Sequence, residues 1–144
     1  MQNIITLENQ FTIIIRILLS LLLGLLIGIE RQKVKTKTNN HGAAGLRTHA
    51  LVCVGTALIT SIGVILFPAD PIRLAASIMT GIGFIGAGTI IASEKKVMGL
   101  TNAAAVWAVA AIGIAAGIGL YIVAVFTTLI TIIVLELRKF ERLE

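Results

Sequence analysis

The chain has 144 residues, of which 57% are hydrophobic and 13% are charged, and its formal net charge is +5. Soluble domains usually carry about a quarter of charged residues, so this composition argues against a water-soluble fold. The basic residues fall in short clusters between apolar runs. Such clusters are typical of charge at the edges of a membrane and argue against a nucleic-acid-binding surface.

Three apolar segments are each long enough to cross the roughly 30 Å hydrocarbon core of a bilayer as a helix. They cover residues 10–29, 46–67 and 72–92. The first ends at Glu30 and Arg31, the second ends before Pro68, and the third ends at a polar run that contains Glu94. Proline cannot continue a helix, and charged residues leave the hydrocarbon, so these positions predict helix ends.

The uncharged stretch 103–135 would be roughly 50 Å long as one helix, which is too long for a single crossing. Gly117 and Gly119 offer the break, which predicts helices over 101–117 and 119–137. The expected fold is therefore an all-α membrane protein with five transmembrane helices, forming a single domain over residues 1–144.

The distribution of lysine and arginine predicts the orientation, because these residues gather in cytoplasmic loops. Five lie between the first and second segments, two between the third and fourth, and three after the fifth, whereas the other side carries Arg73. The N-terminus is thus predicted outside the cytoplasm and the C-terminus inside.

Small residues crowd the third and fourth segments, notably Gly81, Gly83, Gly86 and Gly88. They match the G-x-G-x-x-G dinucleotide pattern, but that pattern requires a preceding strand, so we interpret them as helix-packing residues. The third and fourth segments are expected at the centre of the bundle, with Trp107 against these glycines. The leucine-rich and isoleucine-rich first and fifth segments are expected to face lipid.

Two G-x-x-x-G patterns occur, one from Gly24 to Gly28 and one from Gly113 to Gly117. Glycines at this spacing allow two helices to approach closely. Packing inside one chain is the favoured interpretation, and a face for a homodimer is the alternative.

Polar residues gather at the predicted cytoplasmic ends of the first four segments. They could form a network that binds an ion or a polar group of a partner, or they could be helix caps and solvated salt bridges. These residues are Glu30, Arg31, Arg47, Thr48, Glu94, Thr101 and Asn102.

Arg16 lies inside the first segment, where a charge costs a few kcal/mol unless it is paired or extends to the interface. Asp70 and Arg73 belong to the same predicted outer face. An ion pair between Arg16 and Asp70 is one interpretation, and an unpaired Arg16 that reaches the interface is the other.

No catalytic, metal or cofactor site is predicted. Cys53 is the single cysteine, so no thiolate cluster can form within one chain, and a metal site at His41 and His49 is not expected. No Ser/His/Asp grouping and no phosphate-binding loop is present, so an enzyme is not expected.

Several runs together resemble the MgtC/SapB family of bacterial membrane proteins. After Arg16 they are LLLGLLIGIER at 21–31, AGLRT at 44–48, RLAA at 73–76, GIGFIGAG at 81–88 and GLTNAA at 99–104, followed by Trp107. Two departures are visible. The chain stops shortly after the fifth segment, where better-known members carry a soluble domain, and it reads Thr101-Asn102 where relatives place Thr-Thr or Asn-Thr.

The resemblance implies a multi-pass protein of the bacterial plasma membrane that is linked to magnesium limitation and, in pathogens, to survival inside host cells. For some members it implies inhibition of the F-type ATP synthase through its membrane sector.

Three functional hypotheses follow. The first is a regulator whose helices pack against a partner in the bilayer, which the family resemblance favours. The second is a transporter of magnesium or another small solute, with a path between the outer group Arg16, Asp70 and Arg73 and the inner residues Glu30, Arg47 and Asn102. The third is a homo-oligomeric module, such as a dimer.

Overall fold

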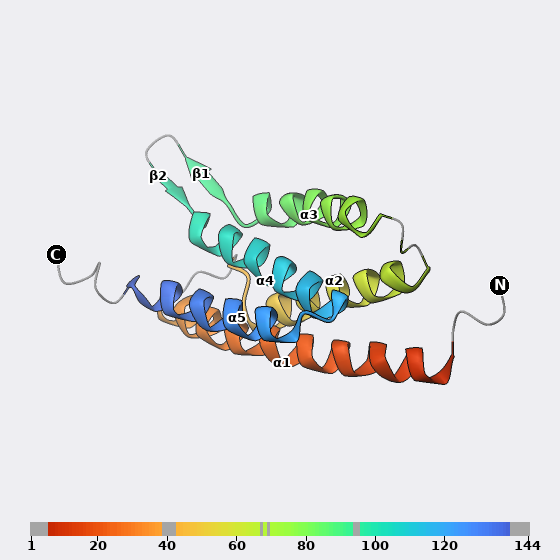
Figure 1. Ribbon diagram of the computed structural model, residues 1–144. Helices are drawn as coiled ribbons and strands as arrows, with labels where there is room; N and C mark the ends of the chain where they lie inside the picture. Colours follow the sequence, from red (N-terminus) through yellow and green to blue (C-terminus); the bar gives the residue numbers. More distant parts are fainter. Residues whose placement is uncertain (1–5, 39–42, 67, 69, 94–95, 139–144) are drawn as a thin grey trace.

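The computed structural model describes residues 6–38, 43–66, 68, 70–93 and 96–138. Within them the chain forms a bundle of helices whose axes are roughly aligned, with successive helices running in opposite directions (Figure 1). The helices are α1 (Leu7–Thr38), α2 (Leu46–Leu66), α3 (Pro71–Ala87), α4 (Leu100–Ile118) and α5 (Tyr121–Glu136). A short antiparallel hairpin of β1 (Ile91–Ser93) and β2 (Lys96–Met98) connects α3 to α4.

Helices α1, α2 and α4 are long and apolar enough to cross a membrane, by length and composition. The apolar helices α3 and α5 are shorter. The predicted helical fold is therefore confirmed apart from the hairpin, whereas five crossings, their orientation and the single domain over 1–144 stay predictions.

The third helix was predicted to end at residue 92. It ends at Ala87, and the hairpin follows it. Gly99 follows the hairpin with a φ of 94°, a conformation that residues with a Cβ rarely adopt. A Cβ at Gly99 would also overlap the carbonyl oxygen of Thr89. The backbone can therefore pass this close to Thr89 only because residue 99 is a glycine.

The break between α4 and α5 lies where the sequence predicted it. Gly119 has a φ of 101°, its N–H donates to the carbonyl of Ala116 (3.1 Å), and the N–H of Leu120 donates to the carbonyl of Ala115 (2.9 Å). These two bonds form a Schellman motif, which ends a helix by satisfying its last carbonyl groups.

The first G-x-x-x-G pattern packs α1 against α2. A Cβ on Gly24 would lie 2.8 Å from Cβ of Cys53, and one on Gly28 would lie 2.8 Å from the carbonyl oxygen of Leu46. These distances are too short for any side chain, so the two backbones meet only because both residues are glycine.

The second pattern packs α4 against α2, further along the face of α2 that meets α1. A Cβ on Gly113 would lie 2.5 Å from the carbonyl oxygen of Cys53, and one on Gly117 would lie 2.7 Å from that of Ala57. Packing inside one chain is thereby confirmed for both patterns, and α1, α2 and α4 all contact one another.

The predicted centre of the bundle is confirmed for α4, which contacts all four other helices, and is wrong for α3. Helix α3 lies outermost beside α4 (Figure 1), and α1 contacts α2, α4 and α5 instead of facing only lipid.

Gly81 and Gly83 face open space, whereas Gly86 is buried and approaches Ala103. Gly88 meets only its own helix, and the side chain of Trp107 is 52% exposed. Apolar composition could not show which helices meet, because side chains facing lipid are apolar too.

Candidate functional site

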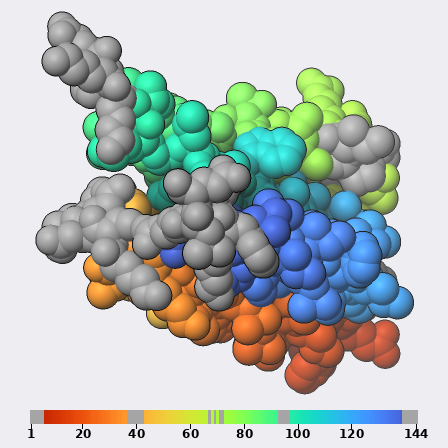
Figure 2. Space-filling model, turned by 90° about the vertical axis from the view of Figure 1, so that its left-hand side faces the viewer, coloured from red at the N-terminus to blue at the C-terminus, as the bar shows by residue number. Residues whose placement is uncertain are grey.

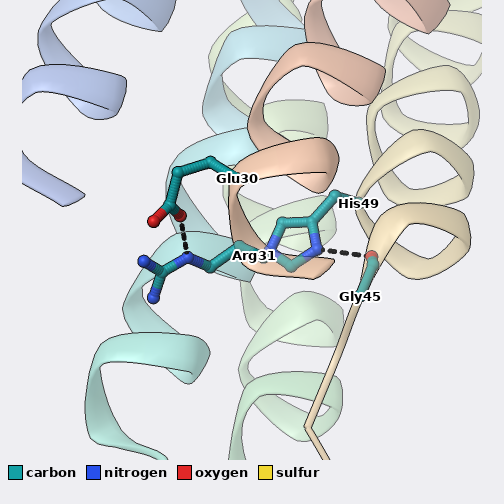
Figure 3. Close-up of polar contacts among 4 residues, drawn as sticks. All are labelled: Glu30, Arg31, Gly45 and His49. Carbon is teal, nitrogen blue, oxygen red and sulfur yellow. Dashed lines mark hydrogen bonds and ion pairs between the residues drawn. The ribbon is translucent and has the colours of Figure 1, made fainter. Parts of the chain in front are cut away.

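Glu30 and Arg31 form a buried ion pair near the C-terminal end of α1. Their exposed fractions are 7% and 5%, and Nε of Arg31 donates to Oε2 of Glu30 (Figure 3). Removing both charges from water costs free energy, and loss of one partner would leave the other charge buried and uncompensated. Nη2 of Arg31 is buried and has no hydrogen-bond partner in the described part of the chain. The predicted inner group therefore has a desolvated centre, which solvated helix caps would not have.

His49 joins this centre, although it was not among the predicted site residues. Its side chain is fully buried, and Nδ1 lies 2.8 Å from the carbonyl oxygen of Gly45 (Figure 3). Because a carbonyl only accepts, Nδ1 carries the proton, and Nε2 is the acceptor of the neutral ring. Nε2 has no partner among the described residues. The ring also lies within electrostatic reach of Arg31 and Glu30.

A helical pattern could have revealed His49. With Cys53, Thr56 and Thr60 it repeats at intervals of four, three and four residues, which places all four on one face of α2. All four side chains are buried. The position of His49 on the packed face is thus readable once the start of α2 is known.

The side chain of Asn102 connects the start of α4 to the segment that precedes α2 through hydrogen bonds. It is 8% exposed, and its carboxamide lies against the backbone of Ala44. In the orientation that satisfies both groups, the amide nitrogen donates to the carbonyl of Ala44 (3.1 Å) and the amide oxygen accepts from the N–H of Ala44 (2.7 Å). Asn102 therefore positions the chain next to the buried ion pair.

The remaining predicted inner residues do not enter the buried centre. Arg47 is exposed and Thr48 is half-buried, and both line a pocket of about 460 Å³ at the start of α2. Thr101 is exposed in the first turn of α4. Glu94 and His41 lie outside the described residues.

Arg16 has a different partner from the one considered above. Its Nη1 donates to the carbonyl of Gly117 (2.7 Å), and its Nε donates to the hydroxyl of Tyr121 (3.4 Å). The guanidinium thus lies at the C-terminal end of α4, where the helix dipole favours a cation. Asp70 instead caps α3 by accepting from the N–H of Arg73 (3.1 Å). The ion pair between Arg16 and Asp70 was a wrong interpretation.

Within the described residues, no three histidines, cysteines or carboxylates gather into a group that could hold a metal ion. The site therefore consists of one buried ion pair, a buried imidazole and an anchoring amide. Such groups can hold elements together or donate hydrogen bonds to a polar ligand.

Comparison with known proteins identifies the family of the chain. Residues 17–143 match the model of the MgtC family. The chain is 39% identical over 132 residues to the putative magnesium transporter YhiD of Escherichia coli K12, covering 85% of this chain and 59% of that protein. It is 41% identical over 121 residues to protein MgtC of Salmonella typhimurium LT2, covering 84% and 50% respectively.

An uncharacterized protein of Haemophilus influenzae is 37% identical over 140 residues, which cover 90% of this chain and 56% of that protein. The chain thus spans about half the length of the curated relatives it matches. No solved structure matches it. Because the family model covers nearly the whole chain, and the glycine contacts and buried polar centre lie inside the matched residues, the chain belongs to the MgtC family.

Proposed function

We propose that this chain is a regulatory protein of the bacterial plasma membrane, with five crossings and a cytoplasmic C-terminus. In this proposal it acts under magnesium limitation by packing against another complex in the bilayer, and the target is the membrane sector of the F-type ATP synthase. Support comes from the family, from the resemblance described above and from the closed packing of the core.

The close packing around α2 is the observation that carries the proposal. Glycines bring α1 and α4 into backbone contact with α2. The buried hydroxyls of Ser20, Thr56 and Thr128 donate to carbonyl groups of their own helices. A magnesium ion needs oxygen ligands and usually keeps several waters, and this packed core offers it little room.

The outer face of α3 is the contact surface that we assign to the partner. Gly81 and Gly83 have no other atoms within 4 Å of a Cβ position, and the adjacent Phe84 is 85% exposed. Small residues beside a large apolar one permit close approach of a second helix in a bilayer.

ATP-driven proton pumping in inverted membrane vesicles tests this function. Vesicles that contain the chain should pump more slowly than vesicles without it. Phe84→Ala should relieve the inhibition, whereas Ile122→Ala, which changes an equally exposed residue on α5, should not. Unchanged pumping in vesicles with a verified amount of folded chain would reject the proposal.

Crosslinking from Gly81→Cys distinguishes a partner complex from a homodimer. The native Cys53 is buried and should not react. Adducts with ATP-synthase subunits would support the assigned contact surface. A disulfide-linked product of twice the mass of the chain would instead show that this face joins two copies.

Magnesium transport is the second candidate, because one relative is named a putative magnesium transporter. The unpartnered buried atoms of Arg31 and His49 show that the inner end could accept a polar ligand. Magnesium uptake by proteoliposomes, read with an internal fluorescent indicator, tests this function. Uptake that is abolished by Glu30→Gln and by Arg47→Ala would favour transport, and uptake equal to that of empty liposomes would exclude it.

A further inference from the structure

Two adjoining pockets lie where the end of α1 passes the start of α2. One, of about 390 Å³, has a mainly apolar lining from Ile29, Thr36, Leu46 and the stem of Lys33. Gln32 and Leu46 line both pockets, and the side-chain oxygen of Gln32 accepts from the N–H of Leu46 (3.3 Å). The two pockets thus form one site with an apolar part and a polar part.

The polar pocket, of about 460 Å³, is cationic. Lys35 and Arg47 line it together with Gln32, Gly45, Leu46 and Thr48. Among the described residues that line either pocket there are three cations and no carboxylate. The first turn of α2 carries no acidic residue, so the positive end of its dipole adds to this charge.

The depth of the site matches the boundary of a bilayer. Ile29 is the last residue of the uncharged stretch of α1, and Lys33 and Lys35 follow it four and six residues later. At 1.5 Å per residue they lie roughly 6 to 9 Å beyond Ile29 along the helix, which corresponds to the headgroup region. This end of α1, orange in Figure 2, is at the surface of the molecule.

We propose that this site binds an anionic phospholipid, with its phosphate between Lys35 and Arg47 and the upper part of an acyl chain over Ile29 and Leu46. The apolar pocket favours a lipid over a free phosphate, because a free anion would use only the cationic part. The inference depends on the membrane location of α1 and α2 and is independent of the regulatory function proposed above.

Native mass spectrometry of the detergent-purified chain tests the proposal, with phosphatidylglycerol and phosphatidylcholine as probes. A cation near a membrane surface contributes about fivefold to the affinity for an anionic lipid, so phosphatidylglycerol should bind about 25-fold more tightly than phosphatidylcholine. Lys35→Gln and Arg47→Gln should each reduce this preference about fivefold, and Arg47→Lys should retain it. Arg73→Gln, which removes an exposed cation at the opposite end of the bundle, is the matched control and should change nothing.

A further variant tests the contact between the apolar part of the site and the acyl chain. Ile29→Ser should weaken both lipids by a similar factor, because it removes contact with the acyl chain and leaves the charge unchanged. Equal binding of the two lipids by the unmodified chain would overturn the proposal. So would displacement of phosphatidylglycerol by inorganic phosphate at millimolar concentration, since the site would then be one for a free anion.

Discussion

Replacement of Gly113 by alanine should destabilise the bundle, because α2 leaves no room for the added Cβ. That atom would lie 2.5 Å from the carbonyl oxygen of Cys53 and would overlap Oγ1 of Thr56. Overpacking of a core costs about 1–3 kcal/mol, and contact with a backbone atom places this site near the upper value. Alanine regains about 1 kcal/mol of helix propensity. The net loss should therefore be about 2 kcal/mol.

Unfolding in mixed micelles with increasing dodecyl sulfate measures this loss. Trp107 is the single tryptophan and lies in α4, six residues before Gly113, so its fluorescence reports on the helix that must move. Gly81→Ala is the matched control, since a Cβ there meets no other atom within 4 Å, and it should be neutral or slightly stabilising. The added change Thr56→Ala should restore part of the stability of Gly113→Ala, because the clash with Cys53 remains. Equal stability of Gly113→Ala and Gly81→Ala would refute the close packing of α4 on α2.

Three further predictions concern polar contacts. Glu30→Gln should lower the free energy of unfolding by about 3 kcal/mol in the same assay, because it leaves Arg31 charged and buried, and adding Arg31→Met should recover most of the loss. Arg16→Met should cost about 1–2 kcal/mol by removing a charged donor from the carbonyl of Gly117, and an unchanged unfolding midpoint would contradict this role. Asn102→Asp should lose the bond to the carbonyl that precedes α2, so trypsin should cut the basic segment between α1 and α2 about tenfold faster. Cleavage at the unmodified rate would show that the amide does not hold this segment.

The break between α4 and α5 shows how far sequence reasoning extends. An uncharged stretch of this length cannot cross a bilayer once, and Gly119 can adopt the positive φ that ends a helix. Both facts are local, and the structure confirms the break. The two G-x-x-x-G patterns were read correctly for the same reason, because two glycines four residues apart lie on one helix face.

Sequence reasoning did not identify which residues contact one another across the bundle. Arg16 bonds to the carbonyl of Gly117, a residue 101 positions away, and not to Asp70. The buried His49 beside the ion pair was missed because its position depends on the start of α2 and on which face meets α1. The hairpin from β1 to β2 was missed because no charged residue separates the apolar residues of β1 from those of α3.

The sequence by itself determined the apolar segments, the charge at their ends, the glycine break and the family. These are properties of consecutive residues, and the bilayer translates them directly into helix length and depth. Only the tertiary structure decided that α4 contacts every other helix, that α3 lies outside and that Glu30, Arg31 and His49 share one buried site. Apolar side chains suit lipid and protein neighbours alike, so hydropathy cannot identify the neighbours of each helix, and the fit of the glycine faces decides them.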